Sequence, residues 1–274
     1  SERTLQQHGR GLLDADAGRR TLGASDLARD ADNVWTDISV VDAQAYAGWT
    51  HDYYFKRFGR AGIDGRNAPL NIVVNALSQT GALQLTQLSD VLRFAVNATW
   101  CAPCLGGEGR LFFGNGIPPG FHIGGVNTTY FAGALDTVAH EYTHAVLSHT
   151  SRLLYVGESG AVEEGFADMM SKVVEFFYYA PGSGVGQADC VFSKDTDRAV
   201  LPGVPSGVRS LANPGLFGLP DHYSRYRFLP ITGGDNGGVH VNAGIPSHAF
   251  YLAIEGGTNR PSGMSAQVVG AANR

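Results

Sequence analysis

The chain has 274 residues, of which 43% are hydrophobic and 16% charged, and its formal net charge is −5 at pH 7. A chain of this length can bury a sizeable core and can form two lobes about a cleft. The weakly acidic balance gives no basic surface for nucleic acid, and no run of 18 apolar residues provides a membrane-spanning helix. We therefore expect a globular protein with neither nucleic acid nor a membrane as a partner.

The first part of the chain is expected to hold few regular elements. Residues 1–29 are polar, and within them only residues 9–13 indicate a short strand. Residues 42–58 have the spacing of a helix. Its buried side is expected to carry aromatic residues: Tyr46, Trp49, Tyr53 and Phe58.

Strands are expected next, because apolar and β-branched residues gather in short runs. Residues 70–75 predict one strand, and residues 91–96 predict an edge strand that leads into Asn97. Residues 111–136 alternate apolar runs with glycine, which is typical of hairpin strands.

A Cys-Ala-Pro-Cys motif follows Trp100, at Cys101 and Cys104. The thioredoxin active site has this pattern, so one hypothesis is a thiol–disulfide oxidoreductase. That activity needs the first cysteine at a helix N-terminus, where the thiol pKa is lowered. Residues 105–109 are glycine-rich, and no βαβ pattern surrounds the motif. We therefore favour a local disulfide in an oxidising compartment.

The most informative motif is His140-Glu141-Tyr-Thr-His144. Residues 136–150 contain no glycine or proline, and their apolar residues recur at three- and four-residue steps, which predicts a helix. On a helix His140 and His144 share one face and can bind one metal ion. Because this pattern occurs in metalloproteases, a third ligand nearby is the test of a zinc site.

Residues 158–168 can supply that ligand. Ser159 is expected to cap a second helix, with Glu163 and Glu164 in its first turn, where the helix dipole favours acidic residues. Glu164 and Asp168 share a face, so one can bind the metal while the other accepts a hydrogen bond from a ligand histidine. The alternative is a solvated acidic face, which we disfavour beside the two histidines. The residues expected to be buried on this helix are Val162, Phe166, Met169, Val173 and Phe177.

Residues 139–146, Tyr155 and residues 158–168 together resemble the core of the thermolysin family of secreted neutral zinc endopeptidases. Two further blocks resemble that family in the same order. One is Asn-Ala-Thr-Trp at residues 97–100, and the other joins Asp-His-Tyr-Ser at 221–224 to Asp-Asn-Gly-Gly-Val-His-Val-Asn-Ala-Gly at 235–244.

The resemblance implies an α+β fold with two lobes and the active-site helix between them. Residues 1–134 would form a β-rich lobe that presents an edge strand to the substrate, and residues 135–274 a mainly helical lobe. The N-terminal hairpins of the family are expected to be reduced and its C-terminal bundle to be missing. One hypothesis is therefore that a separate C-terminal segment of the same precursor is a partner. Residues 180–220 are rich in glycine and proline and predict a long surface loop.

The resemblance also implies roles for individual residues. Zinc would be bound by His140, His144 and Glu164, with Asp168 behind a ligand histidine. Glu141 would be the general base, Tyr155 and His240 would donate to the developing oxyanion, and Asp235 would orient His240. The expected substrate-binding residues are Asn97, Ala98, Trp100, Arg209, Phe131, Thr137 and Val208, the last three in a pocket for an apolar side chain.

A calcium site of the family would fall on Asp136 and Glu175. Calcium prefers oxygen ligands rich in carboxylate, but Lys172 lies three residues before Glu175. We therefore expect a degraded site in which Lys172 replaces the ion.

The resemblance thus implies a secreted, mature zinc endopeptidase whose substrates are proteins and peptides with an apolar residue after the scissile bond. Besides the oxidoreductase, a catalytically inactive protease-like binding module is an alternative. The residue types at the expected catalytic positions argue against inactivity.

Overall fold

The computed structural model describes residues 5–7, 28, 32, 34–77, 79–102 and 109–267. The strand expected at residues 9–13 and the expected reduction of the N-terminal hairpins lie outside the described residues. Among the described helices, none is long and apolar enough to span a bilayer.

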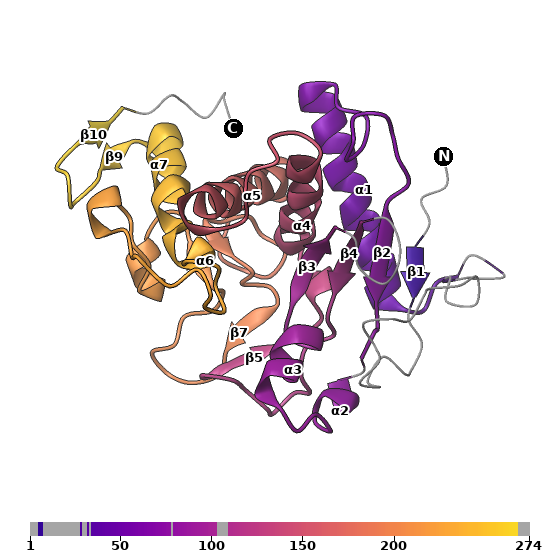
Figure 1. Ribbon diagram of the computed structural model, residues 1–274. Coiled ribbons are helices and arrows are strands. Elements are labelled where there is room, and N and C mark those ends of the chain that lie inside the picture. The colour runs from indigo at the N-terminus through magenta and orange to yellow at the C-terminus, as the bar shows by residue number, and fades with distance from the viewer. Residues whose placement is uncertain are drawn as a thin grey trace.

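The N-terminal part combines one four-stranded sheet with a long helix (Figure 1). Its elements are β1 (Leu5–Gln7), α1 (Ile38–Phe58), β2 (Asn71–Val74), α2 (Gln79–Ala82), α3 (Leu88–Phe94), β3 (Ala98–Cys101) and β4 (Arg110–Phe113). The strand order is β1-β2-β4-β3, with β1, β2 and β4 parallel and β3 antiparallel to β4. As the last strand in this order, β3 has an edge that no other described strand of the sheet covers.

The rest of the chain is mainly helical. Its elements are β5 (Val126–Thr128), η3 (Phe131–Gly133), α4 (Leu135–Ser148), α5 (Gly157–Tyr178), β6 (Val191–Phe192), β7 (Asp197–Ala199), β8 (Arg209–Ser210), η4 (Pro214–Phe217), η5 (Tyr223–Arg225), α6 (Val239–Asn242), α7 (Gly244–Glu255), β9 (Gly257–Thr258) and β10 (Ser265–Ala266). β5 pairs with β7, β6 with β8 and β9 with β10, each antiparallel. The expected α+β class is confirmed.

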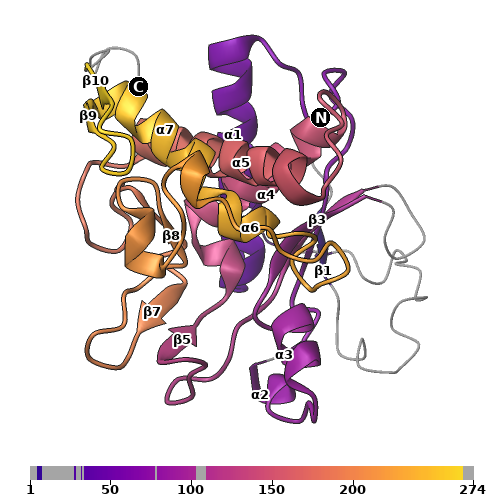
Figure 2. The same ribbon diagram turned by 60° about the vertical axis from the view of Figure 1, so that its left-hand side comes forward.

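The α4 helix lies between the sheet and α5, as the two views in Figures 1 and 2 show. Every residue of α4 from Leu135 to Leu147 is buried. The hydroxyl of Tyr54 on α1 lies 2.9 Å from that of Thr143 on α4. The rest of the fold therefore encloses α4 and positions the histidine motif between the sheet and α5.

Small residues let the next helices approach α5 closely. A Cβ at Gly160 would collide with Val239 of α6, and a Cβ at Gly165 would collide with Pro246 of α7. Because α5 lacks side chains at these two points, α6 and α7 pack directly onto it.

The strand predicted at residues 91–96 is wrong, because α3 covers Leu88–Phe94 and the edge strand begins only at Ala98. Leu88, Val91 and Leu92 recur at helical spacing, and Asp90 lies in the first turn. The prediction relied on β-branched and aromatic composition, whose preference for strands is weak. The strand at residues 70–75 is confirmed as β2.

The predicted helix at residues 42–58 is confirmed as α1, but its buried side is only partly as expected. Tyr53 is buried, whereas Trp49 and Phe58 are exposed. The surface loop expected at residues 180–220 is also partly wrong. It contains β6, β7 and β8, and residues 192–197 are buried.

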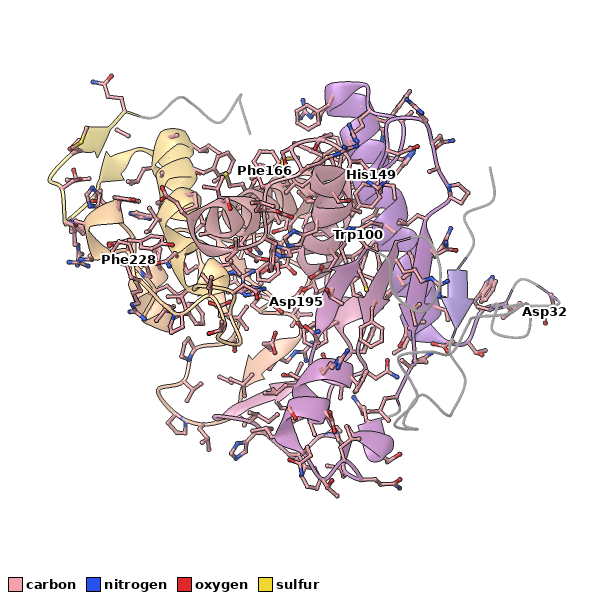
Figure 3. All side chains as sticks on the ribbon, in the orientation of Figure 1. Asp32, Trp100, His149, Phe166, Asp195 and Phe228 are labelled. Carbon is pink, nitrogen blue, oxygen red and sulfur yellow. The ribbon has the colours of Figure 1, made fainter. Side chains whose placement is uncertain are left out.

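The expectations for the start and buried face of α5 are wrong. The helix starts at Gly157, and the Ser159 hydroxyl donates to the carbonyls of Leu154 and Val156 instead of capping. Val162, Phe166 and Phe177 are exposed, and Figure 3 marks Phe166 on this helix. The opposite, polar face of α5 is the buried one.

Candidate active site

Three side chains from α4 and α5 converge on one point. Nε2 of His140 lies 3.0 Å from Nε2 of His144. Oε2 of Glu164 lies 3.4 Å from the first nitrogen, and Oε1 of the same carboxylate lies 3.2 Å from the second. All three residues are buried, and their donor atoms lie within 4.8 Å of one another. These are the zinc ligands predicted from the sequence.

The spacing of these atoms fits zinc. Ligands at zinc-binding distance in a tetrahedron lie about 3.3 Å apart, and the three observed separations bracket that value. Oε2 of Glu164 is buried and has no hydrogen-bond partner among the described residues. A buried carboxylate oxygen is costly without a partner, so a cation at this point would satisfy it.

The charges around this point also favour a cation. Four acidic residues are buried here, Glu141, Glu163, Glu164 and Asp168, whereas Arg209 is the one buried guanidinium that contacts them among the described residues. Burial disfavours ionisation of Glu164, but His144 and His240 hold the pKa of its carboxyl well below its usual range. When the two ligand histidines are neutral, as metal binding requires, these four acids outnumber Arg209, and a dication would balance the excess negative charge.

A second layer of residues holds His140. Its Nδ1 lies 3.1 Å from Oδ1 of Asp168, close enough for the predicted pairing but outside hydrogen-bond geometry. Arg209 donates two hydrogen bonds to Asp168, at 2.8 Å to Oδ2 and 2.7 Å to Oδ1. Despite burial, this guanidinium lowers the pKa of the Asp168 carboxyl. Phe192 packs against the His140 ring at 4.7 Å and under the Arg209 guanidinium at 4.6 Å.

The sequence analysis missed the partner of His144. Oε1 of Glu163 lies 3.3 Å from Nδ1 of that ring. Glu163 precedes the third ligand directly and was expected only to interact with the helix dipole. No motif distinguishes it from a surface acid, and neither did the sequence indicate the role of Phe192.

Glu141 lies between the ligand site and the edge strand. Its side chain points away from its own helix toward β3, where Oε2 accepts a hydrogen bond of 2.7 Å from the backbone N–H of Trp100. Glu141 is buried, with 7% of its surface exposed. This contact joins a residue predicted to be the general base to one predicted to bind substrate.

The predicted oxyanion donors also lie at the site. The Tyr155 hydroxyl donates to Oε1 of Glu164 and lies 3.2 Å from Nε2 of His240. Nδ1 of His240 lies 2.6 Å from Oδ1 of Asp235, which also accepts from the His240 backbone N–H. Burial and the nearby Glu164 raise the pKa of the Tyr155 hydroxyl above its usual value, so it remains a donor.

The predicted substrate-binding residues differ in their exposure to solvent. Ala98 and Trp100 lie on β3, directly after Asn97. Phe131 and Thr137 are buried, whereas Val208 is exposed. Their role in a specificity pocket stays a prediction.

The sequence was then compared with known proteins. Residues 4–148 match the family described as thermolysin metallopeptidase, catalytic domain, and residues 151–273 match thermolysin metallopeptidase, alpha-helical domain. The chain belongs to the thermolysin family.

Individual relatives agree with this assignment. Bacillolysin from Bacillus cereus is 34% identical over 261 residues, and thermostable neutral protease NprT from Geobacillus stearothermophilus is 34% identical over 256 residues. These alignments cover 93% and 92% of this chain, and 39% of each relative. The chain thus spans about two fifths of the length of these relatives.

A solved structure is also similar. It is the precursor of protealysin, a metalloproteinase from Serratia proteamaculans, with a TM-score of 0.61 and 25% sequence identity. The superposition covers 91% of this chain and 67% of the solved chain.

The position expected for calcium in a thermolysin-family chain is held by a lysine. Lys172 Nζ donates to Oδ2 of Asp136 at 2.7 Å, to Oε2 of Glu175 at 2.8 Å and to the carbonyl of Val191 at 2.7 Å. Although burial opposes its charge, Asp136 and Glu175 raise the pKa of Lys172. These residues do not fit a calcium ion, because the ammonium group already lies among the oxygens that would bind it.

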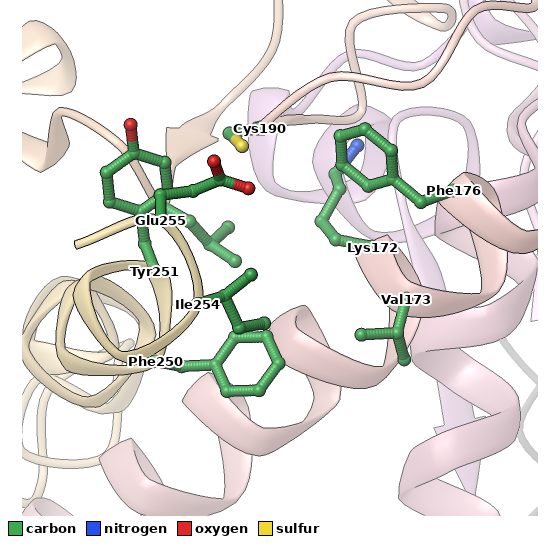
Figure 4. A pocket seen from close by; sticks show the side chains of 9 residues that line it. Lys172, Val173, Phe176, Cys190, Phe250, Tyr251, Ile254 and Glu255 are labelled. Atoms are coloured by element: carbon green, nitrogen blue, oxygen red, sulfur yellow. The ribbon is translucent and has the colours of Figure 1, made fainter. Parts of the chain in front are cut away.

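The predicted disulfide stays a prediction, since Cys104 lies outside the described residues. Cys190 is a thiol in a small pocket between α5 and α7. Figure 4 shows Phe250 and Ile254 of α7 facing Val173 and Phe176 of α5 across this pocket. None of the predicted catalytic or zinc-binding residues lines it, so it is separate from the candidate active site.

Proposed function

We propose that the chain is a zinc-dependent endopeptidase that hydrolyses internal peptide bonds of proteins and peptides. The observation that carries the proposal is the convergence of His140, His144 and Glu164, with Glu141 held between them and the edge of β3. Zinc, when bound, would polarise the scissile carbonyl and lower the pKa of a water molecule.

Glu141 is the general base in this proposal. It accepts the proton of the attacking water and later gives it to the leaving amine. The hydrogen bond from Trp100 supports this role, because it orients the carboxylate toward the strand where a substrate would lie. No side chain needs to form a covalent intermediate.

Tyr155 and His240 would donate hydrogen bonds to the oxygen that becomes negative during the attack. Both already face one acceptor, Oε1 of Glu164, which accepts from Tyr155 and lies 3.4 Å from Nε2 of His240. Nδ1 of His240 donates to Asp235, so Nε2 can donate to the oxyanion when both ring nitrogens carry a proton. His240 in turn lowers the pKa of the Asp235 carboxyl despite burial. Donors aimed at a developing charge are a large source of catalysis.

The substrate would bind as an added strand along β3. Extended peptides pair with an exposed sheet edge through their backbone, so many sequences are accepted, while side-chain pockets select among them. We propose that Phe131, Thr137 and Val208 contribute to a pocket for an apolar residue after the scissile bond. We further propose that the protein acts outside the cell.

The test is to digest an unfolded protein with the zinc-loaded chain and to identify the products by mass spectrometry. The proposal predicts cleavage on the amino side of large apolar residues. Products without that bias would contradict the specificity, and an absence of products would contradict the activity.

A further inference from the structure

The imidazole of His144 lies between two consecutive glutamates of α5. Nε2 lies 3.2 Å from Glu164, while Nδ1 lies 3.3 Å from Glu163. Neighbouring residues of a helix project about 100° apart, so one helix can reach both nitrogens of the ring. Glu164 contacts the metal-facing nitrogen, and Glu163 the outer one.

His140 has the same arrangement with a different residue. Its Nε2 faces Glu164, and its Nδ1 lies 3.1 Å from Asp168. Both outer nitrogens therefore face a carboxylate, and Glu164 is shared between the two rings. The two outer carboxylates differ in one respect, because Arg209 neutralises Asp168.

Glu163 has no such cation. Among the described residues, His144 is its one ion-pair partner, and its side chain is 12% exposed. A buried carboxylate is costly without a donor. The N–H of His144 Nδ1 supplies that donor when Nε2 is the metal-facing nitrogen.

We propose that Glu163 is a positioning residue for zinc binding. It accepts the Nδ1 proton of His144, which fixes the tautomer that leaves the Nε2 lone pair for zinc, and its charge makes that nitrogen a stronger ligand. The inference rests on the proposed function only in that it assumes zinc as the metal. The chain thus has two carboxylate–histidine pairs, Asp168 with His140 and Glu163 with His144. Arg209 neutralises the charge of Asp168 but does not contact Glu163 among the described residues.

The experiment measures zinc affinity without any substrate. The zinc dissociation constants of the parent chain, Glu163→Gln and Glu163→Ala are determined by competition with a chromophoric chelator. Loss of such a partner typically weakens metal binding about 10- to 100-fold. We expect about 10-fold for Glu163→Gln, whose amide oxygen still accepts the proton, and about 100-fold for Glu163→Ala.

Glu158→Gln is the matched control, because Glu158 is an exposed glutamate in the first turn of the same helix. Its zinc affinity should equal that of the parent, and circular dichroism of the zinc-free chains checks that each variant is folded. If Glu163→Ala does not fold, the zinc affinity of Glu163→Gln relative to the parent alone tests the inference. Unchanged zinc affinity in the folded Glu163 variants would overturn the inference.

This outcome is distinct from failure of the proposed function. A chain that binds zinc tightly through Glu163 but cleaves no peptide would contradict the endopeptidase and leave the positioning role intact. If the parent chain cleaves peptides and Glu163→Ala binds zinc as tightly as the parent, the positioning role is contradicted and the endopeptidase proposal stands.

Discussion

The backbone N–H of Trp100 donates a hydrogen bond of 2.7 Å to Oε2 of Glu141. It links the edge of the sheet to the helix that carries two zinc ligands, although the two residues are 41 positions apart in the chain. A substrate on β3 would therefore lie beside Glu141, the proposed general base.

Replacing Glu141 by glutamine should abolish turnover and preserve zinc binding. The amide cannot accept the water proton, and general-base catalysis typically contributes about 10²- to 10⁴-fold. We expect kcat to fall by at least that factor in a peptide assay, with the bound zinc content unchanged by metal analysis.

Cys101→Ser serves as the comparison for the rival redox activity. The endopeptidase account expects its peptidase activity to stay near that of the parent. If Cys101→Ser were inactive and Glu141→Gln were fully active, the thiol–disulfide oxidoreductase would replace the endopeptidase.

Substitution of His240 by alanine should lower kcat more than it raises KM. A donor that acts on the developing oxyanion contributes about 10²- to 10³-fold to kcat. Asp235→Asn should have a smaller effect in the same direction, because His240 keeps its ring but loses the carboxylate 2.6 Å from Nδ1. A loss confined to KM in both variants would assign them to substrate binding instead.

Lys172→Met should destabilise the fold by about 3–5 kcal/mol, because it leaves buried Asp136 and Glu175 without their cation. Chemical denaturation of the zinc-free chain measures this loss, and Lys56→Met, at an exposed position on α1, is the control. A calcium-selective chelator should leave the unfolding midpoint of the parent unchanged. A large drop on calcium removal would contradict the replacement of calcium by Lys172.

Arg209→Met should destabilise the zinc-free chain by about 3–5 kcal/mol at neutral pH, because Asp168 would remain buried without its cation. Arg209 lowers the pKa of Asp168 in the folded state, so the stability from this pair is present above the usual aspartate pKa and lost as pH falls. The difference between variant and parent should thus shrink as the pH is lowered through and below the usual aspartate pKa of about 3.9. Urea unfolding at several pH values tests this, and a constant difference would argue against the linkage.

The zinc ligands could be predicted from the sequence because helical geometry is local. His140 and His144 are four residues apart, so any helix there brings them together. The third ligand could be predicted because a catalytic zinc site takes three protein ligands and a second helix with acidic residues follows in the sequence. The same motif predicts Glu141 as the general base, which stays a prediction.

The buried face of α5 could not be predicted from side-chain size. Val162, Phe166 and Phe177 are each at least 40% exposed, whereas Glu164 and Asp168 are at most 1% exposed. Burial of a polar face is favourable here because the partners of these carboxylates come from α4 and β8, which are distant in sequence. Gly160 and Gly165 marked that face, since close helix packing needs small residues.

Glu163 was missed for a related reason. Its partner lies on α4, 19 residues away, and one sequence does not show which of two adjacent glutamates faces a histidine. Such contacts depend on how the two helices are rotated against each other, which local spacing does not determine.

The central claim is that zinc at His140, His144 and Glu164 makes this chain an endopeptidase. The most direct test is cleavage of a quenched peptide with a central Gly-Leu or Gly-Phe bond, before zinc removal, after chelation and after zinc is restored. Cleavage that is lost and then recovered, on the amino side of the apolar residue, is the predicted result. Cleavage that persists in the zinc-free chain, or a folded, zinc-loaded chain that never cleaves, would contradict the claim.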